Sequence, residues 1–280
     1  MYTQQAAPMM PSHPADDVCT VCLGKLTLHS LTVAELFSNH SEELKHIATV
    51  HSEMFVYAHE NAAFGALLRR TVNTIDGRPI HFLCSFLYPG RNLHKLSGSD
   101  LIYDLAEYAT RHSQRVFLLG AAAASNDGAM EALRARYPGI QIDGYSPPFC
   151  SNIEDPEWNK AILNRIATFA PTHLVVCFGP VKQEMWISRN ADYLFQVGVR
   201  CAYGLGGTLD FVSGRKKRAP RWIQHIGAEW LFRVFTEPGR VGRTAKMFKM
   251  PYFAFRFYQR KIEFVRTVSV SPAVSNANES

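Results

Sequence analysis

Apolar runs with the composition of buried strands alternate with helix-like segments through the middle of this chain. The runs are RVFLLG (115–120), IQIDGY (140–145), HLVVCFG (173–179) and VRCAYGLGG (199–207), with a further strand predicted over MFVYA (54–58). Because the segments between them have the length of single helices, the strands are predicted to run parallel in a sheet that helices cover. The chain is therefore predicted to have an α/β fold.

Sheets of this type bind ligands outside the carboxyl ends of their strands. The loops after residues 58, 120, 144, 179 and 205 are therefore predicted to carry the function. Two local signals support the intervening helices. Thr32 and Glu35 form a capping-box pattern, and Asp155 followed by Pro156 is typical of a helix start.

The alternation ends near residue 212, and the sequence beyond it is basic, aromatic and mostly helix-like. We predict a disordered leader over 1–20, an α/β core over 21–212, a C-terminal appendage over 213–266 and a disordered tail over 267–280. The apolar content of 47% excludes a wholly disordered chain. No apolar run reaches the roughly 18 residues of a membrane-spanning helix. The first residues lack the basic and apolar parts of a signal peptide, so a cytoplasmic location is expected.

The six cysteines include only one Cys-x-x-Cys pair, formed by Cys19 and Cys22. A structural zinc site needs four ligands, and no second pair lies nearby. Ordinary reduced thiols are therefore expected, as in a cytoplasmic protein.

The net charge of +6 is concentrated near the C-terminus. Residues 215–266 contain 14 Lys or Arg and three Glu, an excess of +11, which leaves −5 for the rest of the chain. The excess begins with four consecutive cations, Arg215 to Arg218. A nucleic-acid-binding domain usually spreads its cations and stacking aromatics over the whole domain, so an acidic core argues against nucleic acid as the partner.

Several polar or glycine-rich positions follow the predicted strands. Asp76 and Gly77 follow a short apolar stretch, where Asp76 has the chemistry of a general base and the pair also has the pattern of an ordinary turn. Gly120 ends RVFLLG in a loop that suits a phosphate or simple close packing, and the loop does not match the Gly-x-Gly-x-x-Gly dinucleotide pattern. Lys182, Gln183 and Glu184 open a helix, either as recognition groups for a base or sugar or as a solvated first turn.

The last candidates lie towards the C-terminus. Gly206 and Gly207 permit a tight backbone turn, and Asp210 and Arg218 follow them. Three arginines then come at spacings of 7 and 3, which suits a grip on phosphate or a solvated basic face; they are Arg233, Arg240 and Arg243.

Taken in order, these segments resemble the WecG/TagA/CpsF family of bacterial glycosyltransferases over about residues 22–253. The resemblance rests on the segments DG (76–77), FLLG (117–120), YPGIQIDGY (137–145), KQEMWI (182–187), GGTLDFVSG with RAPRW (206–222), and EWLFR with EPGRVGR (229–243). It implies a Rossmann-like fold and transfer of a sugar from a UDP-sugar to a saccharide on a polyprenyl diphosphate, without a metal, at the inner face of the cytoplasmic membrane.

The resemblance also implies roles for individual residues. Asp76 falls on the catalytic base, and Asn61 on the asparagine of a Thr-x-Asn pocket motif in which His59 replaces the usual threonine. The three arginines match those of an appendage that closes over the diphosphate. The family commonly has proline before its Lys-Gln-Glu triplet, where this chain has Val181.

We therefore expect an inverting, metal-independent glycosyltransferase that needs no cofactor beyond its UDP-sugar substrate. Its expected partners are the UDP-sugar, a polyprenyl-diphosphate-linked saccharide, an anionic inner-membrane surface contacted by the aromatic and basic run over 246–266, and possible further copies of itself. The alternative from another class is a membrane-surface binding protein that keeps the fold without turnover.

Overall fold

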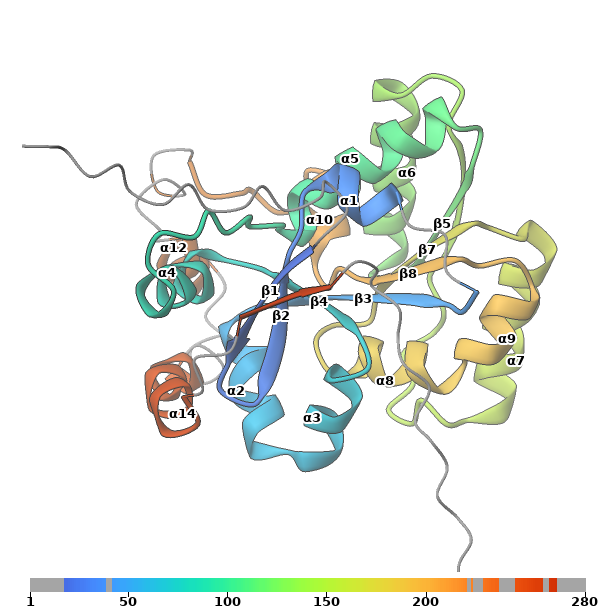
Figure 1. Cartoon of the computed structure of the whole chain (residues 1–280). Coiled ribbons are helices and arrows are strands. Elements are labelled where there is room, and N and C mark those ends of the chain that lie inside the picture. The colour runs from blue at the N-terminus through green and yellow to red at the C-terminus, as the bar shows by residue number, and fades with distance from the viewer. Residues whose placement is uncertain are drawn as a thin grey trace, which may run out of the picture.

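A computed structural model describes residues 18–38, 42–220, 223, 229–236, 245–258 and 262–265. Its centre is one nine-stranded sheet with the strand order β6-β5-β7-β8-β3-β4-β2-β1-β9 (Figure 1). The strands are β1 Val18–Leu23, β2 Leu26–Ser30, β3 Lys45–Val50, β4 Val72–Ile75, β5 Arg115–Gly120, β6 Gln141–Tyr145, β7 His173–Cys177, β8 Cys201–Gly204 and β9 Ile262–Val265. The predicted α/β fold is confirmed.

Neighbouring strands from β6 to β2 are all parallel, and β1 pairs antiparallel with both β2 and β9. From β3 the chain moves to β4 towards one edge of the sheet, whereas from β5 it moves to β6 towards the other. Connections that diverge in this way leave the loops at the carboxyl ends of the central strands open to a ligand.

Helices cover both faces of the sheet (Figure 1). The helices are α1 Val33–Ser38, α2 Ser52–Glu60, α3 Ala62–Leu68, α4 Arg78–Leu87, α5 Gly98–Arg111, α6 Ala123–Arg136, α7 Pro156–Phe169, α8 Lys182–Arg189, α9 Ala191–Gln196, α10 Thr208–Val212, α12 Glu229–Thr236 and α14 Met250–Arg256, with a 3-10 turn, η2, over Met247–Lys249. No helix in the described part of the chain is long and apolar enough to cross a membrane.

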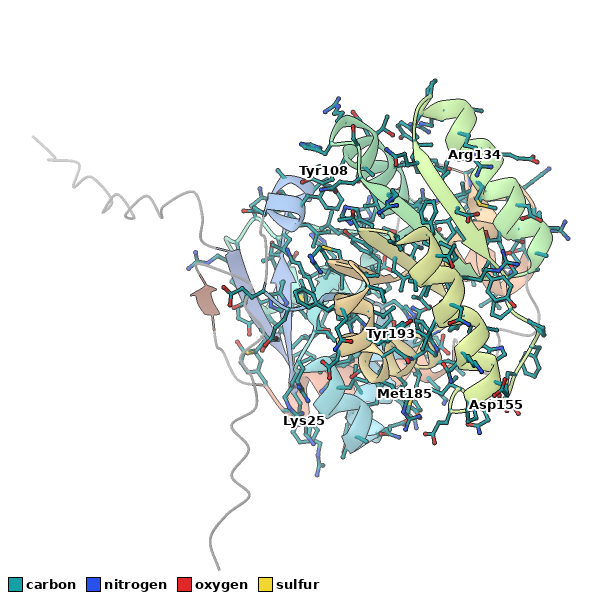
Figure 2. All side chains as sticks on the ribbon, turned by 90° about the vertical axis from the view of Figure 1, so that its right-hand side faces the viewer. Lys25, Tyr108, Arg134, Asp155, Met185 and Tyr193 are labelled. Atoms are coloured by element: carbon teal, nitrogen blue, oxygen red, sulfur yellow. The ribbon has the colours of Figure 1, made fainter. Side chains whose placement is uncertain are left out.

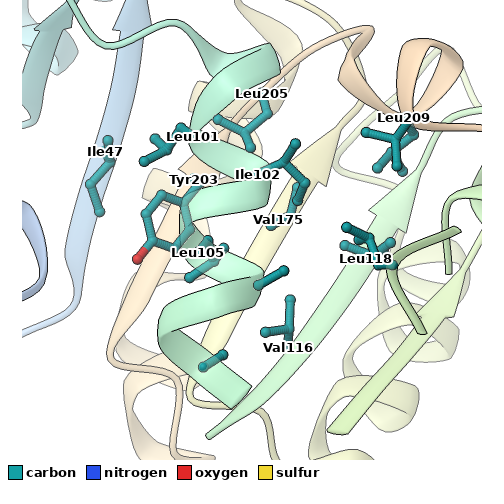
Figure 3. Packing of buried hydrophobic residues seen from close by; sticks show 14 of the residues in the cluster. Ile47, Leu101, Ile102, Leu105, Val116, Leu118, Val175, Tyr203, Leu205 and Leu209 are labelled. Atoms are coloured by element: carbon teal, nitrogen blue, oxygen red, sulfur yellow. The ribbon is translucent and has the colours of Figure 1, made fainter. Parts of the chain in front are cut away.

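Alternation along the strands separates the core into two faces. In β5, Val116 and Leu118 pack with α5 and α6, whereas Phe117 and Leu119 pack with α7 and α8 on the opposite face. Figure 3 shows the first of these faces, where Leu101, Ile102 and Leu105 of α5 meet the strands. A parallel sheet buried on both sides needs apolar residues at nearly every strand position, which explains the continuous apolar runs in the sequence.

The strand predicted over 54–58 is wrong, because these residues lie in α2. Met54, Phe55 and Val56 are all buried there, between the sheet and α14. A short apolar run that is buried on all sides does not distinguish a helix from a strand. The true strand is β3, whose first residues, Lys45 and His46, are polar but buried.

Other boundaries differ by a few residues. The helix predicted to open at Lys182 is α8, which ends at Arg189, and a second helix, α9, begins at Ala191. Strand β1 includes Val18 to Thr20, the last residues of the predicted leader, and β9 adds four residues of the predicted appendage to the sheet. The Thr32–Glu35 capping box and the Asp155 N-cap are both present as predicted.

Candidate active site

Four parallel strands lead into positive-φ backbone at their carboxyl ends. The residues are Gly77 after β4 (φ 79°), Gly120 and Ala121 at the end of β5 (94° and 60°), Gly179 after β7 (91°) and Gly206 after β8 (56°). A positive φ is easy only for glycine. A Cβ atom at Gly179 or Gly206 would meet no atom within 4 Å, whereas at Gly120 it would meet Phe178 at 2.8 Å. Gly120 is thus required by close packing, and the other two border open space.

Asp76 lies at the centre of this edge. Its backbone N–H donates to the carbonyl of Val50 at 3.1 Å, so it directly follows the ladder that joins β4 to β3. The residue is partly exposed, yet loss of hydration raises the pKa of its carboxyl to about 6, opposed by the nearby Lys95 and a hydrogen bond from Ser97. At neutral pH the carboxylate is ionised and more basic than an ordinary Asp, which suits a general base.

A network of charges connects Asp76 to the start of the appendage. Arg218 donates two hydrogen bonds to Asp100 of α5, at 2.5 and 3.2 Å, and its Nε lies 3.7 Å from an oxygen of Glu229 in α12. Lys95 reaches Asp100 at 4.0 Å. The charges of Asp100 and Glu229 further raise the pKa of Asp76. Sequence reasoning missed Lys95, Asp100 and Glu229, because nothing in their local pattern relates them to Asp76.

Arg218, one of the candidate substrate-binding residues, is bound to carboxylates of its own chain, and its contact with substrate stays a prediction. The hydrogen bonds that Arg218 donates to Asp100, together with the charges of Asp100 and Glu229, raise the pKa of Arg218. Asp210 is similarly engaged: it accepts hydrogen bonds from Ser125 at 2.7 Å and Lys216 at 2.8 Å. Burial raises the pKa of Asp210, but these bonds outweigh it and the net pKa is lowered. Two of the four cations at 215–218 are therefore neutralised within the chain.

Gln183 and Glu184 hold the loops of the site in place through hydrogen bonds to their backbone. Gln183 accepts the N–H of Gly206 at 3.0 Å and donates to Glu184 at 2.7 Å, and Glu184 accepts the N–H of Val181 at 2.8 Å. Both side chains are buried, and burial raises the pKa of Glu184 to about 7. A Cβ atom at Gly204 would meet the Glu184 carboxyl at 2.3 Å, so the strand must pass close above it. Direct contact of these two residues with substrate stays a prediction.

The loop before α8 combines strain and an aromatic cage. Val181 has φ 71° and ψ −53°, a γ-turn conformation that is costly for a β-branched residue. Lys182 donates to the carbonyl of Cys150, and its ammonium lies 5.3 Å from the ring of Phe149 and 5.5 Å from that of Trp158. Backbone strain of this kind is retained where surrounding structure holds it, often at functional sites.

The structure does not bring His59 and Asn61 to the Asp76 edge. His59 accepts the N–H of Lys25 at 2.8 Å, in the turn that precedes β2 and hence at the amino end of the parallel strands. Asn61 caps α3 by accepting the N–H of Phe64 at 2.9 Å. Helix α2 explains the separation, since its nine residues carry the chain back across the sheet, by about 1.5 Å per residue.

The residues that do stand beside Asp76 at the end of β3 are Thr49 and His51. Thr49 donates to the carbonyl of Gly204 at 2.9 Å and joins β3 to β8. His51 follows Val50, the ladder partner of Ile75, so it occupies the position next to Asp76. The missed strand β3 hid this pair, because the loop after it was placed at residue 58 rather than at residue 51.

Three further predictions fall partly or wholly outside the described structure. Arg240 and Arg243 lie outside the described residues, and for Arg233 only its place in α12 is described.

Gly207 is exposed and precedes α10. Among the described residues no group of three or more His, Cys, Asp or Glu side chains could hold a metal ion.

The sequence matches the glycosyl transferase WecG/TagA/CpsF family over residues 20–267. It is 28% identical over 233 residues to an N-acetylglucosaminyldiphosphoundecaprenol N-acetyl-beta-D-mannosaminyltransferase of Staphylococcus aureus strain MRSA252, covering 82% of this chain and 85% of the relative. The corresponding protein of strain NCTC 8325 / PS 47 matches with the same identity and coverage. With a family match that spans the sheet, the Asp76 edge and the start of the appendage, the chain belongs to the WecG/TagA/CpsF family of glycosyltransferases.

Proposed function

We propose that this glycosyltransferase moves an N-acetylhexosamine-type sugar from its UDP-sugar to a GlcNAc unit carried on a polyprenyl diphosphate. The relatives are named for transfer of N-acetylmannosamine to N-acetylglucosaminyl-diphosphoundecaprenol, which supports this donor and acceptor class. The observation that carries the proposal in this chain is the position of Asp76, a partly exposed residue directly after β4 at the carboxyl ends of the strands, where the pKa of its carboxyl is raised to about 6.

In the proposed step, Asp76 takes the proton of an acceptor hydroxyl as its oxygen attacks the anomeric carbon of the donor sugar. The bond from that carbon to the diphosphate breaks, and UDP leaves with the electron pair. A single displacement of this kind inverts the anomeric carbon. General-base assistance of this type contributes roughly 10²- to 10⁴-fold in rate.

The departing diphosphate gathers negative charge, which the site must stabilise. Helices α4, α6 and α8 all begin at the Asp76 edge, and the positive ends of helix dipoles favour anions. We propose that these helix starts, with Arg233, Arg240 and Arg243 of the appendage, stabilise the leaving group without a divalent ion. Activity is then expected to survive EDTA. Loss of transfer on chelation, with recovery in magnesium or manganese, would contradict this part.

The acceptor is a membrane lipid, so we propose that the protein works on the cytoplasmic face of the inner membrane. The basic and aromatic residues of η2 and α14 support this, because cations near anionic lipid contribute on the order of 1 kcal/mol each. Cutting the chain after Thr244 is expected to weaken binding to acidic vesicles while sparing part of the activity on a short-chain acceptor.

The experiment that tests the function is a donor screen. UDP-N-acetylmannosamine, its uronic acid and UDP-glucose are each incubated with the protein and a GlcNAc-diphosphate-lipid acceptor, and products are identified by mass spectrometry. A product heavier by one sugar, formed by the wild type and lost in Asp76→Asn, is the expected result. Absence of a product with every donor would favour the alternative, a membrane-binding protein without turnover.

A further inference from the structure

Helix α4, which belongs to the core and directly follows Asp76 and Gly77, exposes two large aromatic rings. Phe82 and Phe86 are 72% and 64% exposed, and their spacing of four residues puts them on one face of the helix. The opposite face is buried against the sheet through Ile80, Leu83 and Cys84. Two large exposed rings beside each other are unusual on a surface helix, so this outer face of α4 is expected to meet another apolar phase.

Two elements of the appendage show the same pattern. In α12, Leu231 and Phe235 are exposed at a spacing of four residues. In η2 and α14 the exposed aromatics come at spacings of four and three; they are Phe248, Tyr252 and Phe255, with exposures of 72%, 56% and 54%. Each segment therefore presents one exposed apolar stripe.

The helices that carry the three stripes, α4, α12 and α14, lie on the same side of the molecule (Figure 1). Helices α4 and α14 cover the same core cluster, where Ile80 and Leu83 join Met250 and Ala254. The start of α12 is close to Asp76, since the charge of Glu229 raises the pKa of that residue, and Asp76 immediately precedes α4. We name the seven exposed side chains of α4, α12, η2 and α14 the apolar platform.

Charge indicates what covers the platform. The segments 78–90 and 245–258 contain no Asp or Glu but four cations, Arg78, Lys246, Lys249 and Arg256, and α12 adds one residue of each sign, Glu229 and Arg233. Lys249 is paired with Glu60 at 2.6 Å, and Arg256 donates to the hydroxyl of Tyr252 at 2.8 Å. A second copy of the chain docked symmetrically here would oppose cations to cations. An anionic lipid surface complements both the cations and the aromatic rings.

We infer that the apolar platform is a bilayer-contact face and that the core helix α4, through Phe82 and Phe86, inserts at the lipid interface beside the catalytic edge. The inference rests on the proposed function for the lipid nature of the acceptor. It goes beyond that function by assigning membrane contact to the α/β core as well as to the appendage. Asp76 would then be held at the depth of the lipid diphosphate by the helix that follows it.

The test uses the full-length double variant Phe82→Gln/Phe86→Gln. Glutamine keeps the helix propensity of α4 while removing both rings. Sedimentation with vesicles of phosphatidylglycerol and phosphatidylcholine is expected to show binding weakened by about tenfold or more, from the apolar area lost to the lipid. The matched control is Tyr193→Gln, which removes an exposed ring on α9, on the face seen in Figure 2 and away from the platform. It is expected to bind as the wild type does.

Two further measurements distinguish lost lipid contact from misfolding. Thermal melting of the double variant checks that it is folded, and Phe82→Leu/Phe86→Leu, which stays apolar, is expected to retain most of the binding. Vesicle binding by the folded double variant equal to that of the wild type would overturn the inference. So would sedimentation velocity showing that the substitutions dissociate a dimer without affecting vesicle binding, because a second copy would then cover the platform. Vesicle binding needs no turnover, so these outcomes are independent of whether the proposed sugar transfer is found.

Discussion

The amino and carboxyl ends of the parallel strands differ in how their polar residues are enclosed. The amino ends are represented by the first residues of three adjacent strands, β3, β7 and β8. At the amino edge Lys45, His173 and Cys201 stand on one rung of the ladder. Lys45 donates to the carbonyl of Leu36 at 2.7 Å, and His173 bonds Tyr203 at 3.0 Å and Gln114 at 2.5 Å. At the carboxyl edge Asp76 keeps partial exposure and lies among turns with positive φ. The charged side chains near it are Lys95, Asp100 and Glu229.

Both edges contain groups with shifted pKa values, so the shift alone does not indicate function. Burial lowers the pKa of His173 to about 4, which keeps it neutral within a closed hydrogen-bond network. Burial raises the pKa of Asp76 to about 6, so its carboxyl is still charged at neutral pH. The residue itself keeps partial exposure. The comparison indicates that a perturbed group becomes a candidate for catalysis when it keeps access to substrate and a charge to use.

The largest expected effect is at the carboxyl edge. Asp76→Asn should lower kcat by about 10²- to 10⁴-fold, because the amide keeps the shape but cannot accept the acceptor proton. Steady-state rates with a lipid-diphosphate acceptor provide the measurement, and Asp192→Asn, an exposed position on α9, is the control. A variant at position 76 that turned over normally would exclude Asp76 as the general base.

At the amino edge the expected effect is on stability. His173→Phe leaves the Tyr203 hydroxyl and the Gln114 carbonyl without this partner, at a cost of about 1–3 kcal/mol in the free energy of unfolding. The wild type loses stability as pH falls from about 6.5 towards about 4, because the unfolded state binds a proton that buried His173 does not. The variant should lack this contribution.

Urea titrations at several pH values measure this, with the exposed His112→Phe as control. Turnover of the His173 variant, measured well below its melting temperature, should match the wild type. A large loss of kcat in the folded variant would show that the two ends of the strands are coupled.

A smaller effect is expected in the pH profile. Asp100→Asn removes a charge that raises the pKa of Asp76 and releases Arg218 from its partner. Both changes favour the carboxylate form of Asp76, so the acid limb of kcat/KM, near pH 6 in the wild type, should move to lower pH. The control is Asp104→Asn on the same helix, which is not among the groups that shift Asp76. An acid limb that stayed in place would separate Asp100 from the base.

The smallest effect is expected at Val181. Its φ of 71° is strained, so Val181→Gly should raise the free energy of unfolding by up to about 1 kcal/mol, reduced by the entropy of glycine in the unfolded chain. Val181→Pro should do the opposite, since proline cannot reach a positive φ and lacks the N–H that Glu184 accepts. Thermal melting of both variants measures the two effects, and melting temperatures equal to that of the wild type would show that this loop stores no strain.

The fold could be predicted wherever a segment carried its own periodicity. β5 follows from its apolar run, the starts of α1 and α7 follow from their caps, and Asp76 could be found because it directly follows a strand. Prediction failed at β3 and α2, since Lys45 and His46 are buried polar residues and the apolar run at 54–58 is buried on every side. With β3 missed, the loop at the carboxyl end of this strand was placed after residue 58 rather than after Val50.

Sequence alone was enough to predict the parallel α/β sheet, the ends of the strands at which the candidate site lies, the candidate acidic residue Asp76 and the family. These depend on local patterns, in which each residue's environment repeats along the chain. Only the tertiary structure decided that Asp100, Arg218 and Glu229 surround Asp76, that Gln183 and Glu184 brace the glycine loops, and that α4 shares an exposed apolar side with the appendage. Such groups are distant in sequence, and only packing of the whole sheet brings their charges and surfaces together.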